Sequence, residues 1–564
     1  MATASDRLYF VADFNIEPLA RELANTTRPG LETAIAPAGP VMAALAAGPP
    51  GADWSAVVWT RPEAISEAFA RARAFERVDH DQAIDDVKAY AAAIGRFAAR
   101  ARSVFVPAWV QPPFARGWGM LDHRPGIGAA DLLARMNAAL ADALVGAPSV
   151  FVLDAGRWLA SAGARGWSQK LWYAAKCPFG PALIELAAAD IAAALDGVVG
   201  RARRLVILDL DDVLWGGLVG EVGWSALTLG GHDHVGEAFA DFQRALKALT
   251  ARGVQLAIVS KNEETAALEA VDRHPEMLLR RGDFAAWRIN WDDKAQNVAN
   301  VLAEVNLGAE SAVFIDDSEA ERARVRAAVP GILVPDWPSD PARFREALES
   351  LRCFDAPVHT AEDRARAGMI ADERSRRTAL AAADNLDDWL RSLEIAITVE
   401  ALVPANLDRA AQLFNKTNQM NASTRRLSAG ELAAWAAAPA HCLLTFRVRD
   451  RFGDYGLTGI VGLELAGSRA RLSDFLLSCR VMGRRVEDAM LHVAAAHALA
   501  RQASTLVVEV VPTARNRPCL DFFLRSGLRQ TCHHIFEWDL SQPYARPDFV
   551  AVADHARVAA SSDP

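Results

Sequence analysis

Short apolar runs alternate with amphipathic stretches along the first 200 residues of the chain. Four of these runs have the length of strands and are bounded by polar or turn-forming residues, namely Arg7–Ala12, Ala56–Trp59, Ser103–Pro107 and Ser149–Leu153. Between the runs, apolar positions recur at helical spacing, as in Ile65–Phe75 and Ala129–Val145. An alternation of strands and helices predicts an α/β unit built on a parallel sheet.

Further along the chain, three apolar runs end abruptly in polar residues. The run from residue 205 is followed by Asp209-Leu-Asp211, the run from 254 by Ser260, and the run from 312 by Asp316-Asp317. The carboxyl ends of parallel strands are where α/β sheets place their ligands, so these groups are expected to meet at one edge. Clustered carboxylates repel one another, and Mg²⁺ prefers oxygen ligands. The pattern therefore predicts a magnesium site, with Lys294 as a nearby cation.

The C-terminal third has a different order of elements. A strand at Ile395–Glu400 and a helix at Leu407–Phe414 precede a polar stretch, and then three strands follow in hairpin-like order, His441–Asp450, Leu457–Leu465 and Ala470–Leu477. A helix at Val486–Arg501 and a strand at Thr505–Val511 complete the pattern. We predict domains at 1–200, 201–356 and 381–540, a linker at 357–380, and a weakly structured tail at 541–564.

The composition limits the classes of protein to which the chain can belong. The chain has 564 residues, 51% hydrophobic and 23% charged, as expected for a globular protein with several domains. The net charge of −9 argues against broad nucleic-acid binding. The six cysteines do not have metal-site spacing, no signal peptide is visible, and no apolar run reaches the ~18 residues of a membrane span. We therefore expect a cytoplasmic protein without a membrane segment.

The sequence Asp209-Leu-Asp211 after an apolar strand resembles motif I of the haloacid-dehalogenase (HAD) phosphotransferase superfamily. The resemblance implies that Asp209 is the nucleophile that attacks phosphorus and that Asp211 is the general acid and base. It further implies that Ser260 binds phosphoryl oxygens, that Lys294 screens charge, and that Asp209, Asp211 and Asp316 hold Mg²⁺. No long insertion separates these motifs, so a capless HAD domain with an open site is expected.

The two flanking domains have resemblances of their own. The C-terminal order of elements resembles the GNAT N-acetyltransferase fold, and Arg480-Val-Met-Gly483-Arg-Arg485 resembles the GNAT loop that binds a phosphate of coenzyme A. Because Arg485 replaces a small residue, the phosphopantetheine arm of a carrier protein is the preferred ligand. The N-terminal domain resembles a flavodoxin-like SGNH hydrolase without its nucleophile, since the first strand ends at Asp13. This domain is expected to be non-hydrolytic, with a carrier-docking or a structural role.

Nearly the whole chain resembles FkbH-type proteins, the glyceryl transferase/phosphatases of polyketide biosynthesis. The segments that carry the resemblance are Lys170–Phe179, Leu208–Gly217, Phe314–Arg322, Asn415–Gln419, Thr424–Arg426, Arg451–Gly456 and Ser478–Gly483. The resemblance implies an enzyme that takes 1,3-bisphosphoglycerate, releases phosphate, and leaves a glyceryl thioester on an acyl carrier protein. The implied architecture is multidomain α/β, with a flavodoxin/SGNH-like domain, a capless Rossmann-like HAD core and an α+β GNAT-like domain.

Some alternatives remain open at this point. Cys479 is either a nucleophile that carries the glyceryl group before the carrier thiol receives it, or a buried cysteine that acts as a small apolar residue. In the first case, the following helix and Arg480 would favour its thiolate form. Two alternatives to the glyceryl transferase/phosphatase concern the whole chain. One is a Mg²⁺-dependent phosphatase for another metabolite, with a vestigial GNAT-like domain, and the other is a non-catalytic scaffold.

Overall fold

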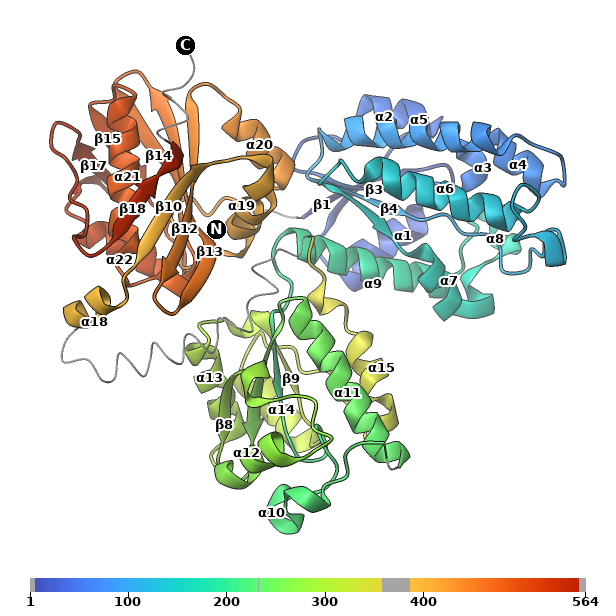
Figure 1. Ribbon diagram of the computed structural model, residues 1–564. Coiled ribbons are helices and arrows are strands. Elements are labelled where there is room, and N and C mark those ends of the chain that lie inside the picture. The colour runs from blue at the N-terminus through green and yellow to red at the C-terminus, as the bar shows by residue number, and fades with distance from the viewer. Residues whose placement is uncertain (1–5, 232, 358–385, 557–564) are drawn as a thin grey trace. The chain divides into compact units, whose positions relative to one another are not determined.

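The computed structural model describes residues 6–231, 233–357 and 386–556 (Figure 1). Two compact units are present, one formed by residues 1–198 and 428–431 and the other by 199–427 and 432–564. The first unit contains one sheet and the second contains two. Most of the linker that we predicted at 357–380 lies outside the described residues. The chain is thus a multidomain protein of the α/β class, as the sequence predicted.

A five-stranded parallel sheet forms the centre of the N-terminal unit. Its strands are β1 (Arg7–Ala12), β2 (Glu32–Ile35), β3 (Ser55–Trp59), β4 (Ser103–Pro107) and β5 (Val150–Leu153), in the order β2-β1-β3-β4-β5. This is the order of flavodoxin-like, doubly wound sheets. The sequence predicted four of the five strands and missed β2, a short edge strand without a fully buried residue.

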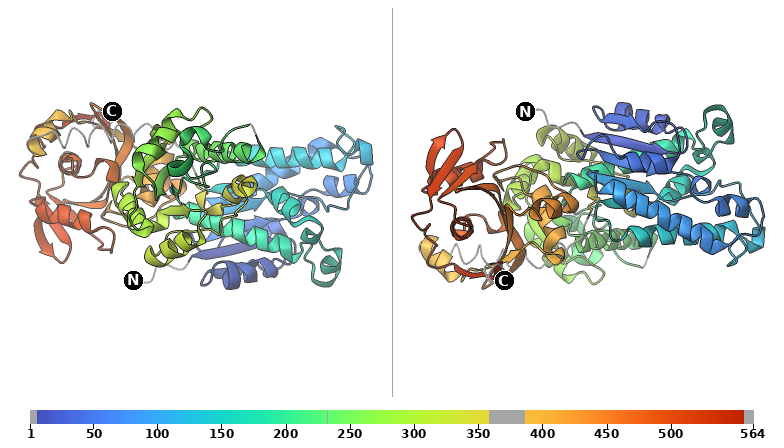
Figure 2. Two further views of the ribbon diagram at one scale, coloured as in Figure 1. Left: turned by 90° about the horizontal axis from the view of Figure 1, so that it is seen from below. Right: turned by 90° about the horizontal axis from the view of Figure 1, so that it is seen from above.

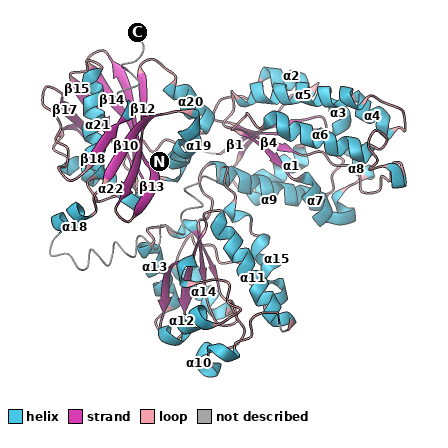
Figure 3. Cartoon of the chain, in the orientation of Figure 1, coloured by secondary structure: helices cyan, strands magenta, loops and turns pink. Residues whose placement is uncertain are grey.

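Helices cover both faces of this sheet, as Figure 3 shows by the alternation of helix and strand layers. Apolar side chains of α2 (Val41–Ala47), α4 (Glu67–Arg73), α5 (His80–Ala98) and α6 (Ala129–Leu144) form the core on one face. The other face is covered by α1 (Glu17–Glu22), α7 (Ala155–Ala162) and α9 (Pro181–Val198). Two short helices, α3 (Pro62–Ile65) and α8 (Gln169–Ala175), lie in loops outside these layers. The three inner strands, β1, β3 and β4, are buried from both sides, which is why their sequences are almost wholly apolar.

The second sheet contains the strands predicted to carry the HAD motifs. It is parallel, in the order β8-β7-β6-β9, and is formed by β6 (Leu205–Leu208), β7 (Gln255–Ser260), β8 (Phe284–Ile289) and β9 (Ala312–Ile315). One face packs against α11 (His234–Ala251), α12 (Glu264–Arg273) and α15 (Phe344–Glu349). The other packs against α13 (Lys294–Glu304) and α14 (Glu319–Ala328). Between Asp211 and the start of β7, the helices of the described residues are α10 (Val219–Val222), a 3₁₀ turn and α11, which agrees with the prediction of a capless domain.

The third sheet is mostly antiparallel and belongs to the C-terminal part of the chain. Its strands are β10 (Ala396–Ala401), β11 (Met420–Asn421), β12 (His441–Asp450), β13 (Gly453–Ala466), β14 (Arg469–Leu477), β15 (Thr505–Glu509), β16 (Arg529–Cys532), β17 (Ile535–Asp539) and β18 (Ala551–Asp554). Its helices are α18 (Leu386–Ser392), α19 (Pro404–Lys416), α20 (Ala429–Ala436), α21 (Val486–Ala500) and α22 (Arg517–Arg525). The sheet curves around its core in Figure 2, and α21 is buried on most sides. The predicted order of strands and helices is present.

The prediction of a weakly structured tail from residue 541 is wrong for its first part. Strand β18 pairs in parallel with β10, from Ala396↔Ala551 to Val399↔Asp554. His497 Nε2 of α21 lies 2.8 Å from Asp554 Oδ2, and Val550 is buried. Residues 557–564 lie outside the described part of the chain. The alternating apolar residues after 549 belong to an edge strand. The sequence did not predict this strand because it is only four residues long.

Among the described residues, no helix combines the length and the apolar character that crossing a membrane requires.

Candidate active site

The predicted HAD residues meet at the carboxyl edge of the four-stranded sheet. Asp209 directly follows β6, Asp316 directly follows β9, Ser260 is the last residue of β7, and Lys294 is the first residue of α13. All four side chains are buried, with exposures between 0% and 7%. Because β6 lies between β7 and β9 in the sheet, Asp209 is at the centre of this group. Residues from four separate segments are thus assembled as the strand ends predicted.

Lys294 bridges the two buried carboxylates. Its Nζ donates to Asp209 Oδ2 at 2.5 Å and to Asp316 Oδ2 at 2.6 Å. Burial lowers the pKa of Lys294, but the carboxylates of Asp209 and Asp316 outweigh this effect and raise the pKa above its ordinary value. Burial, and then the charge of Asp209, raise the pKa of Asp316 to about 6. The ammonium group therefore balances only part of the negative charge that the fold concentrates here.

Three carboxylates of this edge are close enough to hold one metal ion. One oxygen each of Asp209, Asp316 and Asp317 lies within 4.8 Å of the others. With Lys294 protonated, three carboxylates and one ammonium have a formal charge of −3 + 1 = −2. An all-oxygen donor set with this charge suits Mg²⁺, which usually binds through a few carboxylates and completes its shell with water or substrate. The residues present therefore fit the predicted magnesium ion.

The role of Asp211 as a Mg²⁺ ligand stays a prediction. Its carboxylate is not part of the three-carboxylate group, where the third member is Asp317. Asp211 Oδ1 instead accepts hydrogen bonds from the Trp215 indole at 2.8 Å and from the backbone N–H of Val219 at 3.1 Å. The next residue, Asp212, has a φ of 53°, so the chain turns sharply away from the strand direction here. This turn gives Asp209 and Asp211 different surroundings.

Asn262 is a site residue to which the sequence assigned no role. Its Nδ2 donates to Asp211 Oδ2 at 2.9 Å and to Ser260 Oγ at 3.2 Å, and its side chain is 5% exposed. It therefore links the predicted acid/base to the predicted phosphoryl-binding hydroxyl. Its position two residues beyond the end of β7, in Ser260-Lys-Asn262, was the only signal available in the sequence.

The predicted thiol site lies in the C-terminal sheet region. Cys479 is exposed, which excludes the interpretation of this residue as a buried apolar cysteine. It begins a three-residue 3₁₀ helix after β14, and residues 480–485 separate it from the start of α21. Arg480 Nε donates to Ser478 Oγ at 3.2 Å. The thiol is thus accessible for chemistry, and its role as a relay stays a prediction.

The predicted phosphate loop has a carboxyl group of the chain itself in contact with one of its amides. The N–H of Gly483 donates to Glu487 Oε1 at 2.6 Å, so an incoming phosphate would have to displace this carboxyl group. Arg485 is the residue before α21, with a left-handed φ of 61°, and its Nε lies 2.9 Å from Asp488 Oδ2. Binding of the carrier arm by Arg480, Gly483 and Arg485 therefore stays a prediction, with Arg485, which is half-exposed, as its most accessible member.

Comparison with known proteins gives one informative likeness. No protein-family model and no curated protein matches the chain. The N-terminal part of BF1531 from Bacteroides fragilis, which contains a phosphatase domain and was crystallised with Mg, is 23% identical with a TM-score of 0.56. The match covers 63% of this chain and 95% of that one. At this identity, the likeness defines a shared fold.

Acetyltransferase structures also match, over about a quarter of the chain. A phosphinothricin N-acetyltransferase, described as putative, is 15% identical and the ribosomal-protein-S18-alanine N-acetyltransferase from Escherichia coli is 14% identical. Each match covers 26% of this chain, and 99% and 95% of the other chains respectively, with TM-scores of 0.20. These scores are too low to support an argument, so the GNAT-like interpretation depends on the order of strands and helices described above.

Proposed function

We propose that the chain is a Mg²⁺-dependent HAD-type phosphatase and acyl transferase of the FkbH type, which converts 1,3-bisphosphoglycerate and a holo acyl carrier protein into a glyceryl thioester. The observation that carries the phosphatase part is the buried Asp209–Lys294–Asp316 group at the carboxyl edge of a parallel sheet. The Mg-bound phosphatase-domain structure with the same fold supports it. The glyceryl and carrier-protein parts rest on the sequence resemblance.

Phosphate-monoester hydrolysis follows from the positions of the side chains. An oxygen of Asp209 attacks phosphorus, the bond from phosphorus to the glyceryl oxygen breaks, and Asp211 donates a proton to that oxygen. Water then attacks phosphorus and loses its proton to Asp211, which releases phosphate and regenerates Asp209. Asn262 and Trp215 hold Asp211 in place through both of its oxygens.

The cations at this edge act on the charge of the phosphoryl group. Asp209, Asp316 and Asp317 would hold Mg²⁺, and the ion would neutralise part of the negative charge that the phosphoryl group carries. Lys294 orients Asp209 through the hydrogen bond that its ammonium group donates, and Ser260 offers a hydroxyl donor from the end of β7. These side chains come from rigid elements, so they are positioned before the substrate arrives.

Acyl transfer uses the other phosphate of the same substrate. The carboxyl-phosphate bond of 1,3-bisphosphoglycerate is an activated anhydride, so a thiolate can attack the carbonyl carbon and expel phosphate without a nucleotide. The carrier thiol attacks either directly or after the exposed Cys479 has formed a thioester first. Both routes end in the same product, a glyceryl thioester on the carrier.

The phosphatase part is tested by phosphate release from a phosphorylated glyceryl substrate. Asp209→Asn keeps the size of the side chain and removes the nucleophile, so release should fall by several orders of magnitude, and excess EDTA should abolish release by the unaltered chain. Asp272→Asn, which alters an exposed carboxylate on α12, is the matched control. Unchanged release by Asp209→Asn would contradict the HAD assignment.

A further inference from the structure

A pocket in the N-terminal unit is lined by none of the site residues described so far. Its volume is about 390 Å³, within the range of small-ligand sites. Three segments line it together with Arg73 of α4, namely Trp59–Glu63 at the end of β3, Val110–Phe114 after β4, and Trp167–Phe179 around α8. In a sheet of order β2-β1-β3-β4-β5, the strand order reverses between β1 and β3, and ligands bind at such a reversal outside the carboxyl ends. The pocket lies at the carboxyl ends of β3 and β4, beside this reversal.

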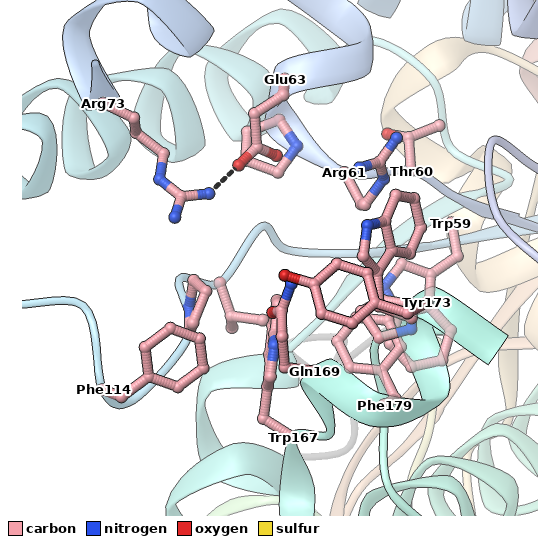
Figure 4. Close-up of a pocket in the computed structure, with 15 residues that line it drawn as sticks. Trp59, Thr60, Arg61, Glu63, Arg73, Phe114, Trp167, Gln169, Tyr173 and Phe179 are labelled. Atoms are coloured by element: carbon pink, nitrogen blue, oxygen red, sulfur yellow. Dashed lines mark hydrogen bonds and ion pairs between the residues drawn. The ribbon is translucent and has the colours of Figure 1, made fainter. Parts of the chain in front are cut away.

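The walls combine exposed aromatic rings with polar groups. Phe114 and Tyr173 are 61% and 70% exposed, which is unusual for such large rings. The indole Nε1 of Trp167 is buried and, within the described part of the chain, has no hydrogen-bond partner. Figure 4 shows the ion pair between Arg73 and Glu63 on one side of the space and Phe114 and Trp167 on the other. Such walls suit a ligand with both apolar faces and hydrogen-bonding groups.

The pocket has the features of a binding site and lacks those of a hydrolase site. Its lining includes no serine, cysteine or histidine. Asp13, which follows β1, accepts hydrogen bonds at 2.7 Å from both the backbone N–H and the side chain of Arg61. The guanidinium group of Arg61 also lies 4.2 Å from the centre of the Trp172 ring. The position expected for a hydrolase nucleophile is thus occupied by a fixed ion pair.

The segments around the pocket have a positive charge, although the chain as a whole has a charge of −9. Residues 155–184 contain four basic residues and no acidic residue, and residues 107–121 contain one basic residue and no acidic residue. The charged groups inside the pocket pair with each other, Arg61 with Asp13 and Arg73 with Glu63. Arg157 pairs with Asp190, which lies outside that range. Lys170 is exposed and follows the lining residue Gln169, and its charge favours an acidic partner.

We propose that this pocket, called here the aromatic pocket, binds the phosphopantetheine arm of an acidic carrier protein, as the alternative to the loop of Arg480, Gly483 and Arg485, while the basic rim contacts the carrier itself. The proposal rests on the proposed function, which supplies a carrier as partner. The arm has apolar methyl groups, two amides and a hydroxyl, which match aromatic walls with hydrogen-bond donors. Its phosphate matches the basic rim.

The proposal also accounts for a segment to which the phosphatase and thiol sites give no role. Lys170–Phe179 is part of the FkbH-type resemblance, and Trp172, Tyr173 and Phe179 from it line the aromatic pocket.

The test is direct binding to the full chain by calorimetry, with free 4′-phosphopantetheine as the probe. The double variant Phe114→Ala/Tyr173→Ala should lower the affinity at least about tenfold, because each ring contributes a stacking contact. The matched control Met42→Ala removes an apolar side chain of 43% exposure outside the pocket and should leave the affinity unchanged. No binding to the unaltered chain, or equal binding by the double variant, would overturn the proposal.

The carrier itself provides the second arm of the test. A holo carrier protein should bind more tightly than its apo form, and Lys170→Glu should weaken holo binding in a salt-dependent manner, whereas Lys88→Glu on α5 should not. Equal binding of holo and apo forms would show that the arm does not enter the pocket. These binding measurements involve no phosphate chemistry. They can therefore overturn the pocket proposal while Asp209-dependent phosphate release is observed, and a loss of phosphate release does not affect them.

Discussion

Removing the ammonium group of Lys294 should destabilise the HAD sheet strongly when Mg²⁺ is absent. Lys294 is 4% exposed and donates to Asp209 and Asp316, which are themselves buried. Lys294→Met keeps most of the side-chain volume and leaves two buried carboxylates without this partner. Breaking a buried ion pair by removing one partner typically costs about 3–5 kcal/mol, and we expect a loss of that size.

The matched control is Lys247→Met on α11. Lys247 Nζ lies 3.4 Å from Asp283 Oδ2, but its side chain is 51% exposed. An exposed pair of this kind contributes at most about 1 kcal/mol. A second comparison is the double variant Lys294→Met/Asp209→Asn, which also removes one of the two buried charges. It should recover part of the stability that Lys294→Met loses.

Hydrogen–deuterium exchange in the presence of EDTA, followed in peptides that contain β6 and β9, measures the local loss of stability in Lys294→Met. Local measurement is needed because a chain with several domains does not unfold in one step. Adding Mg²⁺ should restore protection more strongly in Lys294→Met than in the unaltered chain, because the ion replaces the lost positive charge. Equal protection in Lys294→Met and Lys247→Met, or a double variant less stable than the single one, would refute this account of the site.

Further predictions concern the other polar groups of the two candidate sites. Asp317→Asn should raise the Mg²⁺ concentration needed for half-maximal phosphate release, whereas Asp211→Asn should lower the rate with little change in that concentration, as a Mg²⁺ titration of each variant would reveal. Asn262→Ala removes a hydrogen bond to a charged group, worth about 1.5–3 kcal/mol, so steady-state kinetics should give phosphate release roughly ten- to a hundredfold slower. If Cys479 is a relay, the chain should gain a hydroxylamine-labile glyceryl adduct without carrier, and Cys479→Ala should abolish both adduct and loading; peptide mapping that finds no adduct there would leave direct attack by the carrier thiol.

The buried strands could be predicted because burial on both faces leaves a simple signal. β6 and β9 are fully buried and wholly apolar, and β12 was predicted with its observed bounds. β2, β11 and β18 were missed because they are short strands whose pairing depends on partners distant in the sequence. β11, for example, is two residues long and pairs with the end of β14. Nothing local in a polar segment indicates such a contact.

The candidate site was predictable where a residue ends a strand, and less so where a turn decides the direction of a side chain. Asp209 and Asp316 face each other because parallel strands end together. The different surroundings of Asp209 and Asp211 follow from the turn at Asp212, and the place of Asp317 beside Asp209 and Asp316 was not predicted from the sequence. The contact between Gly483 and Glu487 likewise follows from the fold rather than from the motif.

The aromatic pocket could not be predicted from the sequence for a related reason. Its lining comes from three segments that are separated by about 50 residues each, and no motif joins them. Only the order of the strands in the sheet brings these segments to one edge.

The proposed function is tested most directly by the intact mass of a carrier protein after incubation with the chain, Mg²⁺ and 1,3-bisphosphoglycerate. We predict that the holo carrier gains the mass of one glyceryl group, and that the apo carrier, which has no thiol arm, gains none. A holo carrier of unchanged mass, in a reaction where Asp209 still releases phosphate, would contradict glyceryl transfer and leave a HAD phosphatase that acts on another metabolite.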